Sequence, residues 1–155
     1  MHAEFEIQRA TEYNTPDDEQ FKHWINAVPA ELEQTARFVI RIADEEEARR
    51  LNRDYRNRDY ATNVLSFRAE LPDSLPEEVR QCELGDILIC APVVVRESAE
   101  QRRPETDHWA HLTIHGVLHL LGYDHEIADE AEIMESLEIR ILKQLGVSDP
   151  YTDVS

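Results

Sequence analysis

The stretch "HGVLHLLGYDH" at residues 115–125 contains three histidines, His115, His119 and His125, with a glycine, Gly122, between the last two. It continues the segment "TDHWAHLTI" (106–114), and the two together predict a long helix that ends just before the glycine. Histidines four residues apart lie on one face of a helix, separated by a rise of about 6 Å, so two rings can reach one point. A straight helix cannot bring a third ring to the same side.

Gly122 removes this difficulty because it permits a bend. A residue without a Cβ atom adopts left-handed backbone conformations at little cost, so the chain can reverse and return His125 toward the helix. Three imidazole nitrogens leave one coordination position open, as in catalytic zinc sites. We therefore predict that His115, His119 and His125 bind one Zn²⁺ ion.

Other polar residues surround this motif. His108 and His111 lie on roughly the same helix face as His115. We interpret His111 as a hydrogen-bonded or solvated side chain, and a role as an alternative ligand or as a donor to a ligand stays open. We interpret Asp124 as a residue that orients a histidine or caps a turn.

The motif matches the metzincin protease pattern HExxHxxGxxH at every fixed position except one. In those proteases the residue after the first histidine is a glutamate that acts as the general base, and here it is Gly116. Glycine has no proton acceptor. The motif therefore predicts a metal-dependent hydrolase more clearly than it predicts a peptidase.

Strand and helix patterns intermingle along the chain. Strands are predicted at 4–8, 36–44, 62–67 and 85–91, and helices at 15–29, 44–56, 92–101 (one or two turns) and 126–146. Residues 71–83 contain two prolines and are predicted to form a loop. We predict an α+β, α/β-like fold: one metal-dependent hydrolase domain over residues 1–155, with a small mixed four-stranded sheet packed with helices.

The apolar residues of the last helix and the two tryptophans are assigned to the core. We expect Trp24 and Trp109 to be buried, not to be platforms for bases. Cys82 and Cys90 are interpreted as reduced cytosolic thiols, one of them buried. The buried face of the last helix is predicted to contain Ile127, Ala131, Met134, Leu137, Ile141 and Leu145.

The formal net charge of the 155 residues is −17. Such a charge repels nucleic acid at long range, which argues against a simple RNA or DNA coat. It does not exclude a nucleic-acid enzyme in which positive charge is concentrated locally. The apolar runs are too short to span a bilayer, and "MHAEFEIQRA" lacks the pattern of a secretion signal, so we predict no membrane association.

Positive charge is concentrated in the second predicted helix. Its arginines Arg49, Arg53 and Arg56 lie at i, i+4 and i+7, with Arg50 and Arg58 nearby, and form the predicted phosphate track. Arg49 and Arg50 also follow Glu45 and Glu46 by four residues, so they are placed to form ion pairs within the helix. Thr62, Asn63 and Ser66 are candidates to line a cleft, although such residues more often bond within strands and turns.

Three segments in order resemble the bacterial YbeY family: "LNRDYRNRDYATNVLSF" (51–67), "GDILIC" (85–90) and "HGVLHLLGYDH". The resemblance covers roughly residues 40–146. It implies a cytoplasmic, zinc-dependent single-strand endoribonuclease that matures the 3′ end of small-subunit ribosomal RNA and acts in ribosome quality control. In one departure, Arg68 follows "LSF" where many relatives have proline.

The same resemblance implies roles for individual residues. His115, His119 and His125 correspond to the family's metal ligands, and Arg56 corresponds to its functional arginine. We predict Arg56 and His115 as the catalytic residues, because a guanidinium can hold phosphate while a metal polarises it.

Two alternatives remain open: a metallopeptidase-like zinc hydrolase, and a non-catalytic ribosome-assembly factor whose metal only braces the bend. The expected partners are ribosomal RNA and the small ribosomal subunit. Because the chain is strongly acidic, we expect that ribosomal or assembly proteins contribute to its affinity for RNA.

Overall fold

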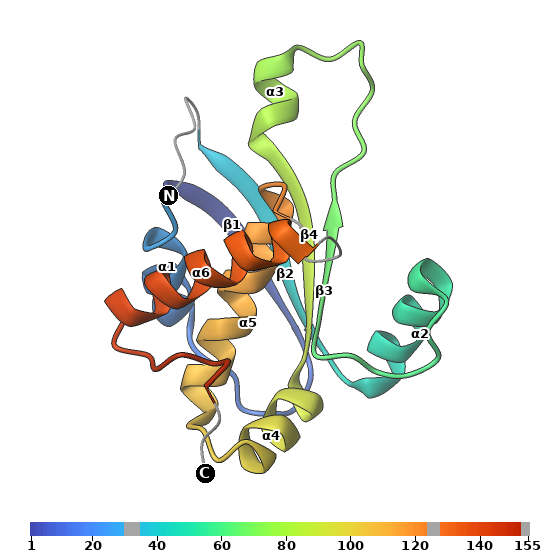
Figure 1. The fold of residues 1–155 in the computed structure, drawn as a ribbon. Coiled ribbons are helices and arrows are strands. Elements are labelled where there is room, and N and C mark those ends of the chain that lie inside the picture. Colours follow the sequence, from blue (N-terminus) through green and yellow to red (C-terminus); the bar gives the residue numbers. More distant parts are fainter. Residues whose placement is uncertain (30–34, 124–127, 153–155) are drawn as a thin grey trace.

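The computed structural model describes residues 1–29, 35–123 and 128–152. Four strands form one sheet in the order β1-β2-β4-β3. Strands β1 (Ala3–Ala10), β2 (Ala36–Ala43) and β4 (Glu83–Cys90) are parallel, and β3 (Val64–Arg68) lies antiparallel to β4 at one edge (Figure 1). The predicted mixed four-stranded α+β fold is confirmed.

Helices cover both faces of this sheet. On one face lie α1 (Asp18–Asn26) and α5 (Glu105–Leu120), and α6 (Ala128–Gln144) crosses α5 on the side away from the sheet (Figure 1). Helix α2 (Glu45–Arg56) lies on the other face. Helix α4 (Ala91–Glu100) follows β4 directly and leads into α5.

The prediction that residues 71–83 form only a loop is wrong. They contain a short helix, α3 (Glu77–Cys82), in an extension between β3 and β4 that stands away from the sheet (Figure 1). Pro76 is the N-cap of this helix, and Glu77 and Glu78 occupy its first turn. A proline at a helix start costs no hydrogen bond, and acidic residues favour that end of the helix dipole.

The alternating side chains of β4 connect two hydrophobic clusters. Ile87 and Ile89 belong to the larger cluster under α1, α5 and α6, and Leu88 and Cys90 belong to the smaller one under α2. Trp24 and Trp109 are 4 % and 2 % exposed, so their assignment to the core is confirmed. Cys82 and Cys90 are both buried and form no disulfide.

Helix α5 is the central helix of the larger cluster. Ten of its 16 residues are buried, from His108 to Leu120. His111, His115 and His119 are only half-buried and follow one another at intervals of four, so they form a single stripe along the helix. Among the described residues, no helix combines the length and apolar character needed to cross a bilayer.

Candidate metal centre and catalytic cleft

Helix α5 ends in the predicted bend. Gly122 has a φ of +109°, and its N–H donates to the carbonyl of His119 at 3.1 Å. The N–H of Tyr123 donates to the carbonyl of Leu118, also at 3.1 Å. These two bonds form a Schellman motif, in which the glycine adopts a positive φ that other residues rarely adopt.

The bend follows two neighbouring histidine rings. The ring centroids of His115 and His119 are 4.8 Å apart, with an angle of 72° between the ring planes. The third predicted ligand, His125, and the neighbouring Asp124 lie outside the described residues. Their roles stay predictions.

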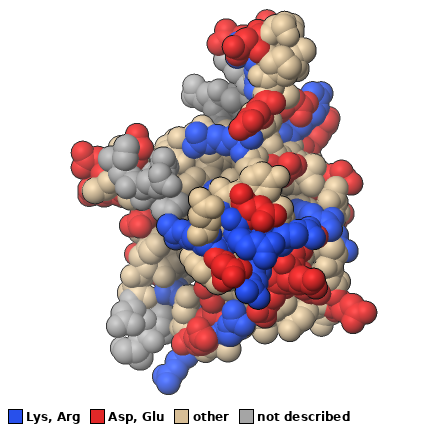
Figure 2. Space-filling model, turned by 90° about the vertical axis from the view of Figure 1, so that its right-hand side faces the viewer, with Lys and Arg blue, Asp and Glu red and all other residues tan. Residues whose placement is uncertain are grey.

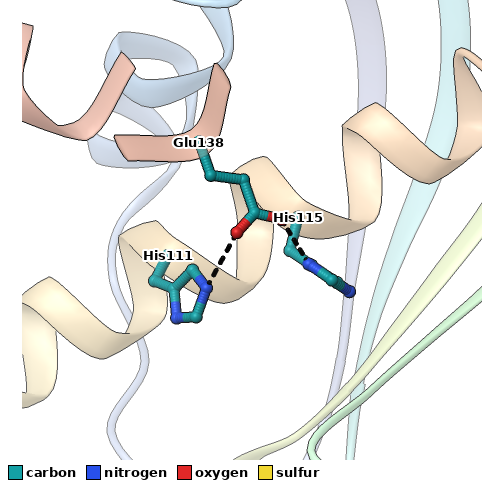
Figure 3. A group of neighbouring side chains, drawn as sticks. All are labelled: His111, His115 and Glu138. Atoms are coloured by element: carbon teal, nitrogen blue, oxygen red, sulfur yellow. Dashed lines mark hydrogen bonds and ion pairs between the residues drawn. The ribbon is translucent and has the colours of Figure 1, made fainter. Parts of the chain in front are cut away.

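Opposite this stripe lies Glu138, a carboxylate of α6 that is 0 % exposed (Figure 3). One of its oxygens accepts a hydrogen bond from Nδ1 of His115, and the other accepts from Nε2 of His111 at 3.3 Å. The hydroxyl of Tyr151 donates to the same oxygen as His111. His111 is therefore a hydrogen-bonded residue in this structure, as interpreted from the sequence.

The environment of Glu138 favours its charged form. Burial raises the pKa of this carboxyl, but the hydrogen bonds from His111, His115 and Tyr151 outweigh burial and bring the pKa to about 2. Burial lowers the pKa of His111. Burial and the hydrogen bond to Glu138 raise the pKa of Tyr151.

The charge state of Glu138 determines the proton position on His115. An ionised carboxylate can only accept hydrogen bonds, so Nδ1 of His115 carries the proton that lies between the two groups. The second ring nitrogen, Nε2, lies on the side of the ring away from Glu138 (Figure 3). In this tautomer Nε2 has the lone pair, and it is the nitrogen suited to bind a metal.

Among the described residues one set can hold a metal ion, and a second set is predicted from the sequence. The first contains His111, His115 and Glu138, whose ligand atoms lie within 4.8 Å of one another. The second is the predicted set, in which His115 and His119 act together. Imidazole and carboxylate donors both suit zinc, so the residues present fit such an ion. His115 belongs to both sets.

The structure also explains why the residue after His115 is glycine. A Cβ atom at Gly116 would lie 2.9 Å from Cγ2 of Ile87 in β4. This position therefore faces the sheet, and a glutamate here would enter the core. The general base of the metzincin pattern has no place at this position.

A cleft of about 1190 Å³ opens between α2, the segment that follows it, and β3. Arg56 and His115, the two residues predicted to be catalytic, both line it. Thr62 and Asn63 line it as well. The cleft is bounded by Asn52, Tyr55, Arg56, Arg58, Tyr60, Thr62, Asn63, Val64, Leu65, Phe67, Arg68, Glu70 and His115.

Edge strand β3 connects the two sides of this cleft. Nη2 of Arg56 donates to the carbonyl of Ser66 at 3.3 Å. The hydroxyl of Ser66 in turn donates to the carbonyl of Gly116 at 3.1 Å, one residue after His115. The position of Arg56 is thus linked through β3 to the helical turn that carries His115.

Arg68 forms a second link from β3 to α5. Its Nε donates to the carbonyl of His119 at 2.9 Å, and its Nη2 donates to the carbonyl of Tyr123 at 3.5 Å. Both carbonyls lie at the bend. Arg68 therefore contacts the backbone on either side of Gly122.

Lysine and arginine side chains gather in a band across the side of the molecule that contains α2, with acidic residues around it (Figure 2). Arg49 belongs to a two-bond ion pair with Asp59, at 2.7 and 3.0 Å. The predicted pair of Arg49 with Glu45 is wrong, since Glu45 pairs with Arg96 at 3.4 Å. Arg49 pairs with Asp59, which follows the helix, instead of with the glutamate four residues before it.

Sequence reasoning did not find Glu138 or Tyr151. A signal for Glu138 was present, because it lies four residues after Met134 and three before Ile141, on the apolar face of the last helix. Met134, Leu137, Ile141 and Leu145 of the predicted face are buried or pack half-buried against the core, and Ile127 lies outside the described residues. Glu138 and Leu142 are buried beside them. No pattern pointed to Tyr151, since its contact with Glu138 depends on the path of the chain after α6.

The fold and site define a small mixed α/β protein with a candidate metal centre beside an arginine-lined cleft. The family model described as "Endoribonuclease YbeY" matches residues 5–146. The chain belongs to the endoribonuclease YbeY family.

Similar proteins agree with this assignment. An endoribonuclease YbeY of Alkalilimnicola ehrlichii is 58 % identical over 138 residues, which are 88 % of this chain and 82 % of that protein. The endoribonuclease YbeY of Halorhodospira halophila is 52 % identical over 150 residues, 97 % of each chain. The solution structure of a Thermotoga maritima protein shares the fold, with a TM-score of 0.54 and 22 % identity over 94 % of this chain and 99 % of that one.

Proposed function

We propose that the protein is a zinc-dependent, single-strand endoribonuclease of the cytoplasm that matures the 3′ end of small-subunit ribosomal RNA and acts in ribosome quality control. The observation that carries the proposal is the placement of Arg56 and His115 on one cleft. A basic residue that can hold a phosphate thus lies in the same cavity as a candidate metal ligand.

The arginine supplies the electrostatic part of the chemistry. Cleavage of a phosphodiester develops negative charge on the phosphoryl oxygens, and a guanidinium placed beforehand stabilises that charge. Arg56 donates to the carbonyl of Ser66 in β3, and this bond restrains its guanidinium beside the cleft.

The metal centre supplies the remaining part. His115 and His119, with the predicted His125, are the residues proposed to hold the ion. A zinc ion bound there provides Lewis-acid chemistry toward the scissile phosphate. Gly116 faces Ile87, and this weighs against the metallopeptidase alternative, because the base that peptide hydrolysis uses in that motif cannot be placed there.

The preference for single-stranded RNA is supported by two aromatic side chains of the cleft. Tyr55 and Tyr60 are 69 % and 51 % exposed, and both line the cavity. Unpaired bases stack on exposed aromatic rings, whereas bases within a duplex are not accessible for such contacts. The buried tryptophans offer no such surface.

The test compares Arg56→Ala with wild-type protein, both loaded with zinc, on an end-labelled single-stranded oligoribonucleotide. We expect kcat/KM to fall by roughly 100- to 1000-fold, the size of effect typical for loss of one charge-stabilising donor. Bound zinc and the thermal midpoint should not change, because Arg56 is exposed.

Arg96→Ala is the matched control. Arg96 lies on α4, pairs with Glu45 and does not line the cleft, so this variant should cleave RNA at the wild-type rate. If Arg56→Ala cleaved RNA as fast as Arg96→Ala, the catalytic role of Arg56 would be wrong. If zinc-loaded wild-type protein cleaved no RNA, the non-catalytic assembly factor would become the better explanation.

A further inference from the structure

Glu138 is a buried carboxyl group that bonds to residues from separate parts of the chain. His111 and His115 come from α5, and Tyr151 comes from the segment after α6. That segment lies beyond residues 5–146, the part of the chain that the family model matches. Tyr151, which bonds to Glu138 beside the candidate metal centre, therefore lies outside the matched part of the chain.

The segment carrying Tyr151 is held in place by Arg103, just after α4. The guanidinium of Arg103 donates to the carbonyls of Asp149, Pro150 and Thr152 at 3.1, 3.0 and 2.7 Å. The N–H of Tyr151 donates to the side chain of Asp149 at 2.8 Å. These bonds fix the turn that directs the tyrosine hydroxyl to Glu138.

Tyr151 also packs against the histidine stripe. Its ring centroid lies 5.5 Å from that of His111, with the ring planes at 82°. With His111, it occupies the Glu138 oxygen that His115 does not use. The remaining oxygen is left to His115, so the orientation of that ring is set by a carboxylate that cannot easily turn away.

We propose that Glu138 is a positioning residue of the metal centre, which fixes the orientation and proton position of His115, and that residues 147–152 belong to this centre through Tyr151. The inference rests on the proposed function only in that His115 binds the metal. In metal sites, a carboxylate that accepts from the second nitrogen of a histidine ligand orients the ring and increases its basicity.

The alternative is that Glu138 itself binds the metal together with His111 and His115. That arrangement would break the hydrogen bonds that Glu138 now accepts from the two rings, because a nitrogen that carries a proton cannot bind a metal. In the positioning role these bonds stay intact, and the metal binds on the far side of the His115 ring.

The first experiment reads the tautomer of His115 in the full-length, metal-free protein by NMR of the ring nitrogens. We expect the Nδ1–H tautomer in the wild type and in Glu97→Gln. We expect a mixture of tautomers in Glu138→Gln, because an amide can both donate and accept. An Nε2–H tautomer in the wild type would overturn the positioning role of Glu138.

The second experiment measures zinc affinity by competition with a chromophoric chelator. Glu138→Gln should bind zinc about 10- to 100-fold more weakly than wild type. Tyr151→Phe should also bind zinc more weakly, by a smaller factor, because the two histidine bonds to Glu138 remain. The matched control is Glu97→Gln, which alters another histidine–carboxylate pair, Glu97 of α4 with His108 of α5 at 2.9 Å, away from His115.

The outcomes separate the inference from the proposed function. If wild type bound zinc and Glu138→Gln bound it equally well, the positioning role alone would fail. If Tyr151→Phe matched wild type, the C-terminal segment would not belong to the centre. If His111→Ala lost zinc as completely as His115→Ala, Glu138 would be a ligand with both histidines. If wild type bound no zinc, the proposed metal dependence would fail as well.

Discussion

Gly116 and Gly122 serve different purposes within one helix and its end. Gly116 permits close packing, since a Cβ atom there would meet Ile87 at 2.9 Å. Gly122 permits a backbone conformation, since its φ is +109° and a Cβ atom there would meet nothing within 4 Å. Replacing each glycine therefore tests a different physical cause.

Gly122→Ala should lower the free energy of unfolding by about 1–3 kcal/mol, the usual cost of a side chain in this part of φ/ψ space. Urea unfolding of the metal-free protein measures it. Gly146→Ala is the matched control, because that glycine also has a positive φ (+79°) and open space around it. Both variants should lose similar stability, but only Gly122→Ala should bind zinc more weakly. Equal zinc affinities would contradict the role of the bend.

Gly116→Glu tests whether the missing glutamate can be restored. We expect severe loss of stability and no peptidase activity, because the side chain would bring a charge into the core against Ile87. Urea unfolding and a peptide-library assay measure the two effects. A stable variant that cleaved peptides would show that position 116 reaches the metal centre after all.

His119→Ala removes one predicted ligand from the half-buried stripe. We expect it to lose bound zinc, measured by metal analysis of the purified variant, and with it the stability that metal binding contributes. The control is His108→Ala, which removes another histidine of the same helix. His108 is buried and bonded to Glu97. One equivalent of zinc retained in His119→Ala would exclude this residue from the ligand set.

At the scale of elements, a polar network joins β3, α4 and α5 at the end of the sheet. Glu97 of α4 accepts from Asn63, just before β3, at 3.0 Å and pairs with His108 of α5 at 2.9 Å. Burial raises the pKa of Glu97, but the hydrogen bonds from His108 and Asn63 outweigh burial and leave it below its ordinary value of 4.5.

This lowered pKa predicts the pH dependence of stability. A group whose pKa is lower in the folded state stabilises the fold above its unfolded pKa, and the contribution is lost as pH falls through the folded pKa. Wild type should therefore be more stable than Glu97→Gln at pH 6–7, and the difference should shrink below about pH 4.5. Urea unfolding across this range measures it, and a difference independent of pH would contradict the network.

At the scale of the whole molecule, charge is unevenly distributed. The chain has 33 acidic residues and 16 lysines and arginines. A band of basic side chains lies on the side that contains α2, and Arg56, Arg58 and Arg68 line the cleft (Figure 2). The cleft can therefore attract a phosphate backbone locally, while the rest of the surface repels it.

This distribution predicts a dependence on the state of the RNA. We expect weak cleavage of naked ribosomal RNA at physiological salt, falling steeply as salt increases, and more efficient cleavage of assembled small-subunit particles. Cleavage of both substrates across a salt series measures the effect. Equal efficiency on the two at physiological salt would show that no protein partner contributes to affinity.

The fold class and the positions of most elements followed from the sequence alone. Alternating strands, helix periodicities and a glycine after an apolar helix are local signals, and each reflects the geometry of a few neighbouring residues. The same local logic placed His115 and His119 on one face and predicted the bend at Gly122. Arg56 was identified by resemblance, and the structure places it in the same cleft as His115.

Only the tertiary structure decided which distant groups meet these residues. Glu138 reaches His115 because α6 crosses α5, and Tyr151 reaches Glu138 because Arg103 holds the chain after α6. The absence of a side chain at Gly116 is explained by Ile87, nearly thirty residues earlier in β4, because a Cβ atom at position 116 would collide with it. Such contacts depend on how the elements pack against one another, and the sequence periodicity of a single element does not predict them.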